Sequence, residues 1–168
     1  MVAASPDGIL VTDKKASPRI KELVDGFNHR PMFEERRWGW YRVLDQMKYE
    51  NGQEVLTKRI GVSAGMNLSY QLHYQRSEVW TITNGEGEFA LDDVIYEVKP
   101  GDVLNIPVGA KHGVKANTDL EFIEVQAGFN LVEDDIVRIF MTWKDVVMHC
   151  EVAQKGIAVS YRSGLKIG

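Results

Sequence analysis

Short runs of hydrophobic and polar residues, separated by turn residues, dominate the chain from about residue 37 to residue 139. Each run has the composition or the period-two alternation of a strand, and glycine, proline, asparagine or aspartate lies at the breaks. The predicted strands are 41–44, 55–62, 67–74, 78–83, 88–91, 94–98, 103–106, 113–116, 120–126 and 136–140. Many short strands at regular spacing favour an all-β sandwich or barrel.

The start of the chain follows a different pattern. Residues 8–11 are β-rich and predict a short strand. Ser17 is suited to the N-cap of a helix and Pro18 to its first position, and an apolar stripe then runs to Gly26. Residues 27–31 have the character of a linker.

The end of the chain carries one further helix signal. Thr142 and Asp145 have the spacing of a capping box just before an apolar run, which predicts a short helix. The remaining residues support no prediction. We therefore expect an N-terminal extension over 1–30, a barrel over 31–141 and a C-terminal tail over 142–168.

Length and composition agree with one ordinary globular domain. The chain has 168 residues, of which 44% are hydrophobic and 26% charged, enough for a full core without disulfides. No apolar run approaches a membrane span, and no signal peptide is visible, so we expect a cytoplasmic protein that does not bind membranes. The single Cys150 agrees with a reducing compartment.

Charge excludes one class of partner. Twenty Lys and Arg against 24 Asp and Glu give a net charge of −4, and the charges are interspersed. Nucleic-acid binding requires a concentrated basic face, so we expect no nucleic-acid partner.

A candidate metal site emerges from the spacing of a few polar residues. Gln71 and His73 are two residues apart, so their side chains share one face of a strand. Glu78 has the wrong parity for that strand, but a bend at 75–77 would return it to the same cavity. His112 follows a turn and begins another strand. Two imidazoles, a carboxylate and an amide oxygen suit Zn, Fe(II), Mn or Co, and leave coordination positions open for water or substrate.

The same residues also permit a simpler interpretation. A single histidine on a strand is often an ordinary hydrogen-bonded residue, and Glu78 can pair with Arg76 or Lys58. The residues alone therefore leave the metal site as one of two hypotheses.

Two glycine-anchored patterns resemble the motifs of the cupin superfamily. The first is Gly65-x5-Gln71-x-His73-x4-Glu78-x6-Gly85, with glutamine where a histidine is common, and the second is Gly101-x5-Pro107-x-Gly109-x2-His112. The resemblance implies a cupin double-stranded β-helix (a jelly-roll barrel), here with a short N-terminal strand-helix extension and a small C-terminal helix. It also implies that Gln71, His73, Glu78 and His112 occupy metal-ligand positions.

Six further segments resemble the type II mannose-6-phosphate isomerase domain, which often forms the C-terminal part of mannose-1-phosphate guanylyltransferases. They begin at Arg36, Lys58, Leu68, Arg76, Ile123 and Glu133. Residues 5–14 resemble the tail of the nucleotidyltransferase domain in those fusions. The resemblance implies isomerisation between mannose 6-phosphate and fructose 6-phosphate. Guanylyl transfer by this chain is not expected, because it lacks the Gly-rich nucleotide-binding start.

Several positions depart from that family. Tyr74, Gln75 and Val79 stand where histidines are usual, and Gly113 replaces a basic residue. The metal positions survive while polar groups around them do not, a pattern that favours metal binding over the family's catalysis.

The sequence leaves the roles of the remaining candidate residues open. Arg76 either holds an anionic substrate group or pairs with an acid, and Lys111 and Lys115 either contribute to phosphate binding or are solvated. The sequence does not identify a general base. Three hypotheses compete. The first is a metal-dependent cupin acting on a sugar phosphate. The second is a non-catalytic cupin that binds a sugar or a nucleotide-sugar, or an accessory subunit of a separate nucleotidyltransferase, and the third is an Fe(II) dioxygenase. The resemblance further implies a homodimer.

Overall fold

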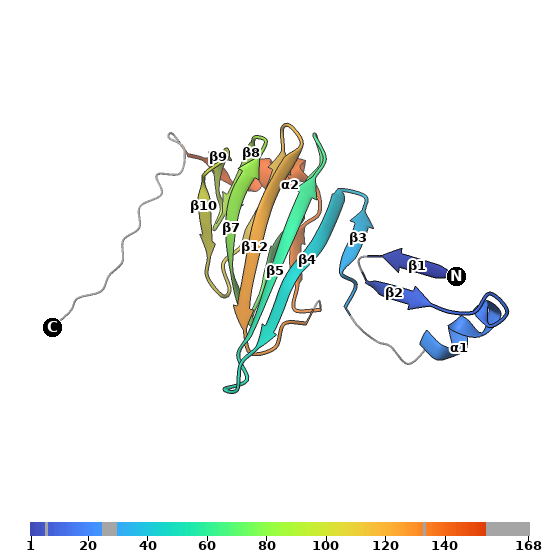
Figure 1. Cartoon of the computed structure of the whole chain (residues 1–168). Coiled ribbons are helices and arrows are strands. Elements are labelled where there is room, and N and C mark those ends of the chain that lie inside the picture. Colours follow the sequence, from blue (N-terminus) through green and yellow to red (C-terminus); the bar gives the residue numbers. More distant parts are fainter. Residues whose placement is uncertain (6, 25–29, 133, 154–168) are drawn as a thin grey trace.

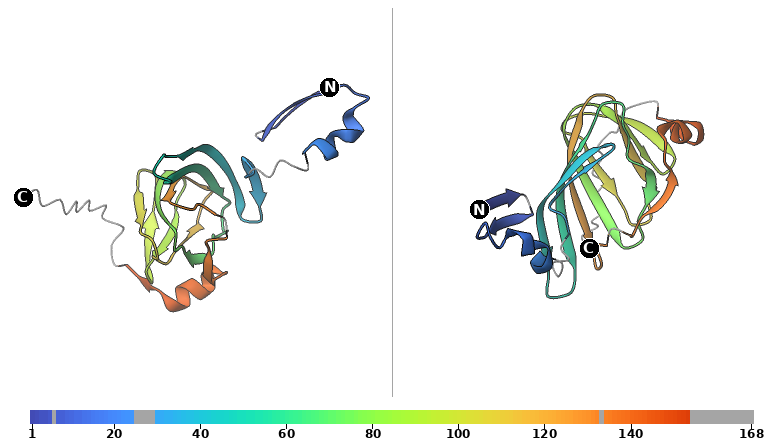
Figure 2. Two further views of the ribbon diagram at one scale, coloured as in Figure 1. Left: turned by 90° about the horizontal axis from the view of Figure 1, so that it is seen from below. Right: turned by 90° about the vertical axis from the view of Figure 1, so that its right-hand side faces the viewer.

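Two six-stranded β-sheets face each other and curve into a barrel (Figures 1 and 2). The structure is a computed structural model that describes residues 1–5, 7–24, 30–132 and 134–153. The first sheet consists, in spatial order, of β10 (Val103–Ile106), β7 (Arg76–Asn84), β12 (Leu120–Gly128), β5 (Glu54–Val62), β4 (Gly39–Lys48) and β3 (Phe33–Arg36). The second consists of β13 (Val137–Phe140), β6 (Tyr70–Leu72), β11 (His112–Ala116), β8 (Gly87–Leu91), β9 (Val94–Val98) and β14 (Glu151–Val152).

The order of the strands identifies the architecture. From β5 to β13, the chain passes back and forth between the two sheets, except at the β8–β9 hairpin within the second sheet. The pairings among these strands are antiparallel. This is the cupin double-stranded β-helix, so the predicted all-β jelly roll is confirmed. The ten predicted strands correspond to β4 through β13, with β9 and β10 predicted to the residue. Strands β3 and β14 were not predicted.

The N-terminal residues form a small unit outside the barrel (Figure 1). β1 (Val2–Ser5) pairs with β2 (Gly8–Val11), and a 3₁₀ turn (η1, Ser17–Arg19) leads into α1 (Ile20–Val24). The predicted strand and helix are confirmed there, and β1 was missed. The expected helix end at Gly26 lies outside the described residues.

The predicted capping box starts α2 (Trp143–His149). The Thr142 hydroxyl accepts a hydrogen bond from the Asp145 backbone N–H at 3.3 Å and donates to the Asp145 carboxylate at 2.6 Å. Trp143 and Val146 pack on the outer side of the second sheet, in a small cluster with Tyr70. Within the described residues, neither α-helix is long and apolar enough to cross a membrane.

Side chains from both sheets fill the space between them. Trp80 stacks on Phe122, with ring centroids 4.6 Å apart, and meets the edge of Phe89 at 5.6 Å. Along β12, the inward positions change from apolar (Leu120, Phe122) to polar (Glu124, Gln126), and all of them are buried. The barrel therefore has an apolar end and a polar end, and the polar end contains the candidate site.

Candidate functional site

A cavity of about 300 Å³ opens into the polar end of the barrel. Its walls include three of the residues singled out in the sequence, namely Gln71, Arg76 and Glu78. This volume is at the lower end of the range for small-molecule sites in proteins. The cavity can therefore admit a small ligand to the side chains of Gln71, Arg76 and Glu78.

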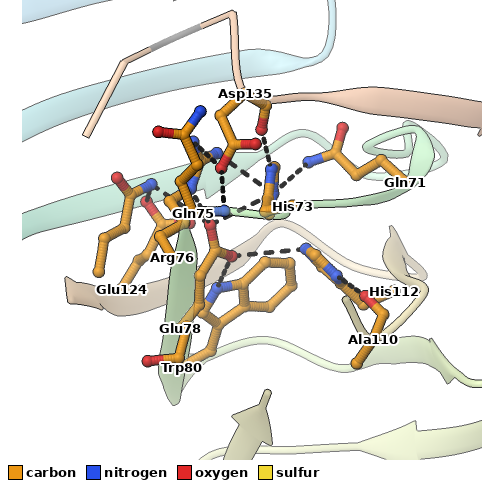
Figure 3. A network of polar contacts seen from close by, with 12 residues as sticks. Gln71, His73, Gln75, Arg76, Glu78, Trp80, Ala110, His112, Glu124 and Asp135 are labelled. Carbon is orange, nitrogen blue, oxygen red and sulfur yellow. Dashed lines mark hydrogen bonds and ion pairs between the residues drawn. The ribbon is translucent and has the colours of Figure 1, made fainter. Parts of the chain in front are cut away.

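Three chain segments bring His73, Glu78 and His112 together (Figure 3). His73 directly follows β6, a bend at residues 74–75 redirects the chain, and Glu78 then points inward from β7. The predicted bend is confirmed, but it begins one residue earlier than expected, and residues 76–77 already belong to β7. His112 begins β11 opposite Gln71 of β6. The Gly109 backbone N–H donates to the His73 carbonyl oxygen at 2.7 Å, which ties the two histidine loops together.

The Glu78 carboxylate lies between the two imidazoles. Its Oε1 is 3.3 Å from His73 Nε2, and its Oε2 is 3.4 Å from His112 Nε2. The three side chains are 1–2% exposed, and one donor atom from each lies within 4.8 Å of the others. Burial acts to raise the pKa of Glu78, but the groups around it, led by His112, outweigh burial and lower the pKa to about 2. The carboxylate is therefore ionised at neutral pH.

Backbone carbonyl groups orient both imidazoles. His112 Nδ1–H donates to the Ala110 carbonyl oxygen at 3.0 Å, and His73 Nδ1–H donates to the carbonyl oxygen of Asp135. Each ring then turns its Nε2 toward the Glu78 carboxylate, in the orientation of metal-binding histidines held by an outer hydrogen bond. Within the described residues, His112 Nε2 is buried without a hydrogen-bond partner. Two imidazole nitrogens and a carboxylate thus fit a divalent transition-metal ion.

Arg76 occupies the interior of this cluster. Its Nε donates to Glu78 Oε1 at 2.8 Å, and its Nη2 donates to His73 Nε2 at 3.2 Å. The guanidinium is 5% exposed. The expected ion pair with an acid is therefore confirmed, whereas a role in holding a substrate anion stays a prediction. The His73 Nε2 lone pair can serve either this guanidinium or a metal ion.

Gln71 lies at the edge of the cluster. Its Nε2 is 3.4 Å from His73 Nε2, while its Oε1 accepts a hydrogen bond from the Ser69 hydroxyl at 2.7 Å. The amide oxygen, the atom that would bind a metal, is thus engaged elsewhere. Its role as a ligand stays a prediction.

A polar wall is formed by Lys58, Glu124 and Gln126. The sequence analysis named Lys58 only as a possible partner of Glu78 and missed the wall. Glu124 on β12 pairs in register with Lys58 on β5, and both are 5% exposed. Gln126 Nε2 donates to Glu124 Oε2 at 2.9 Å and to Glu78 Oε1 at 3.4 Å, which connects the wall to the cluster. The signal was available, because charged residues stand at inward positions of strands whose other inward residues are apolar.

Asp135 was also missed as a site residue. Its carboxylate accepts hydrogen bonds from the Tyr74 and Gln75 backbone N–H groups, each at 3.0 Å, while its carbonyl oxygen holds His73. Asp135 therefore positions the bend that separates His73 from Glu78.

The two lysines that flank His112 do not line the cavity. The Lys111 ammonium pairs with the Asp93 carboxylate, and the Lys115 Nζ lies 3.4 Å from Glu88 Oε2. The possible contribution of these lysines to phosphate binding has no support in this geometry.

The burial of His73 makes folding pH-dependent. Burial lowers its pKa below the ordinary value of 6.5; the Glu78 charge opposes this shift and the Arg76 charge adds to it. The unfolded chain therefore takes up the proton first as pH falls below about 6.5, and stability is lost.

We expect the free energy of unfolding to drop by on the order of 1 kcal/mol between about pH 7 and pH 5, measured by urea denaturation. His73→Gln should reduce this drop, and His149→Gln, at an exposed position, should retain it. An unchanged drop in His73→Gln would contradict this origin.

This chain is similar to a known protein family and to several curated proteins. Residues 25–140 match the family described as mannose-6-phosphate isomerase C-terminal. The chain is 33% identical over 154 residues to the xanthan biosynthesis protein XanB of Xanthomonas campestris pv. campestris, covering 85% of this chain and 32% of XanB. It is 32% identical over 149 residues to a mannose-1-phosphate guanylyltransferase of Escherichia coli, covering 82% of this chain and 30% of that protein. The chain thus spans about a third of the length of these curated relatives.

Among solved structures, the capsular polysaccharide assembling protein CapF from Staphylococcus aureus is similar with a TM-score of 0.53 and 15% sequence identity. The similarity covers 69% of this chain and 34% of CapF. At this level of identity it supports the fold alone.

Proposed function

Because this chain belongs to the mannose-6-phosphate isomerase C-terminal family, we propose that it binds a divalent metal ion and isomerises a sugar phosphate, with mannose 6-phosphate and fructose 6-phosphate as the substrate pair. One observation carries the proposal. His73, Glu78 and His112 form a buried cluster of metal-ligand type beside a cavity of about 300 Å³. A metal ion held by these residues would polarise a substrate carbonyl group and stabilise the negative charge that develops on its oxygen.

The departures from the family do not remove groups from the cavity. Tyr74 is 66% exposed and Val79 is 36% exposed. The Gln75 side chain is not part of the cluster and accepts a hydrogen bond from Asn130. None of the three lines the cavity. The position of these three residues outside the cavity supports the proposal despite the loss of the family histidines.

Glu124 is suited to act as the general base. Among the described residues, it and Glu78 are the carboxylates that line the cavity, and Glu78 belongs to the proposed metal cluster. In the open-chain aldose, the Glu124 carboxylate takes the proton from C2. The C–H electron pair forms the C1–C2 double bond, and the carbonyl electron pair moves to the C1 oxygen. Glu124 then returns the proton to C1, while the hydroxyl proton on the C2 oxygen moves to the C1 oxygen. The product is the ketose.

A coupled assay tests the proposed function. Purified protein is treated with a chelator and then reloaded separately with Zn, Mn, Co or Fe(II), and fructose 6-phosphate formation from mannose 6-phosphate is recorded. We expect turnover that is lost on chelation and restored by at least one ion. Failure of every ion to support turnover, in protein that binds the ion, would contradict the isomerase proposal.

An accessory role is the second candidate, and the N-terminal hairpin favours it. Val2, Ile9 and Val11 are 68–75% exposed on this hairpin, outside the barrel. The longer relatives include proteins named mannose-1-phosphate guanylyltransferases. A separate nucleotidyltransferase would be the partner that covers this apolar surface. Metal binding without turnover in the assay above would favour this role.

A further inference from the structure

A sugar phosphate brings a phosphoryl group with two negative charges into a cavity whose inner cations are already balanced. Arg76 donates to the Glu78 carboxylate, and Lys58 stands opposite Glu124 in the β5–β12 register. Both cations are 5% exposed. The inner wall is therefore suited to sugar hydroxyl and carbonyl groups, and the phosphoryl group requires positive charge elsewhere.

Arg138 supplies such a charge at the mouth of the cavity. It pairs in register with Gln71 across β13 and β6, and directly opposed residues of neighbouring strands point to the same face. Arg138 is accordingly one of the residues that line the cavity, and its side chain is exposed. Within the part of the chain that the structure describes, its guanidinium has no hydrogen bond or ion pair.

Arg36 lines the same cavity from the opposite sheet. It ends β3, and its side chain is 50% exposed. Its Nη2 lies 2.8 Å from Glu34 Oε2, an oxygen that also accepts a hydrogen bond from the Tyr41 hydroxyl at 2.6 Å. A guanidinium offers five N–H donors, so this one contact leaves others for a ligand.

We propose that Arg36 and Arg138 together bind the phosphoryl group of the sugar phosphate at the cavity mouth. The sugar then extends inward, toward Glu124 and the His73–Glu78–His112 cluster. Guanidinium groups form paired, charge-assisted hydrogen bonds with phosphate oxygens, and two of them match a dianion. This inference rests on the proposed function for its choice of ligand, but it concerns binding and not turnover.

Titration calorimetry tests the pair. Mannose 6-phosphate, mannose and inorganic phosphate are each titrated into wild-type protein and into Arg36→Gln, Arg138→Gln and Arg42→Gln. Arg42 is the matched control, because it is exposed on the neighbouring strand β4 and does not line the cavity. We expect each cavity variant to bind mannose 6-phosphate about tenfold more weakly, with Arg42→Gln unchanged. Mannose should bind more weakly than mannose 6-phosphate to wild type and equally to all four proteins.

The outcomes separate this inference from the proposed function. The arginine pair is supported if wild type binds mannose 6-phosphate and both cavity variants bind it more weakly, even if the protein shows no isomerase turnover. The pair is refuted if wild type does not bind mannose 6-phosphate, or binds mannose equally well. The pair is also refuted if Arg36→Gln and Arg138→Gln both bind mannose 6-phosphate as tightly as wild type does, even in a protein with full isomerase activity.

Discussion

Replacing His112 with leucine should abolish tight metal binding while the barrel remains folded. Among the residues that the structure describes, the imidazole Nε2 is buried without a hydrogen-bond partner, and the ring meets the edge of Trp80 with centroids 5.6 Å apart. Leucine removes the Nε2 ligand atom and the Nδ1–H hydrogen bond to the Ala110 carbonyl oxygen. It keeps an apolar side chain against Trp80, so the packing cost should be small. We expect affinity for Zn or Co to fall by at least about 100-fold, because even outer-shell substitutions cost about 10–100-fold.

Metal analysis after dialysis, with far-ultraviolet circular dichroism as the test of folding, measures this effect. His149→Leu is the control, since His149 is exposed on α2 and is not part of the cluster. Metal content equal to wild type in a folded His112→Leu protein would show that the cluster is not the binding site.

Glu124→Gln should reduce turnover strongly and leave metal content unchanged. The amide cannot take up the proton from the sugar carbon, but it keeps the size of the side chain and a hydrogen-bonding group for Gln126. Positioned general bases contribute about 10²–10⁴-fold, so we expect kcat to fall within that range.

Glu121→Gln provides the matched control on the same strand. Glu121 pairs with Arg59 away from the cavity, and its substitution should leave kcat unchanged. A Glu124→Gln protein with kcat close to wild type would assign the proton transfer to another group.

The strand pattern was predictable because the inner and outer faces of the barrel differ so consistently. β9 and β10 were predicted to the residue, since a turn borders each strand: the Asp92-Asp93 hairpin, with φ of 45° and 69°, and the loop at Gly101, with φ of 97°. β3 was missed because Phe33–Arg36 carries three charged residues, as an exposed edge strand can. β14 has two residues, too few for a pattern.

The cluster of His73, Glu78 and His112 was predicted from the sequence, whereas the polar wall was not, although its charged residues at inward strand positions carry a signal. The spacing of His73, Glu78 and His112 along the chain can be recognised in a single sequence. Glu124 and Lys58, in contrast, are far apart along the chain and become neighbours only through the β5–β12 register. Arg36 and Arg138 meet the cavity from different sheets, so their common role depends on how the barrel closes. The site residues that the sequence did not predict are therefore those that come together only when distant strands pair in the folded barrel.

Proton NMR of mannose 6-phosphate in D₂O, with the metal-loaded protein, tests the central claim most directly. Isomerisation through Glu124 predicts that fructose 6-phosphate appears and that the C2 proton signal of the aldose declines, with the metal-stripped protein inactive. A sugar that remains mannose 6-phosphate and keeps its C2 proton, in the presence of protein with bound metal, would contradict the account.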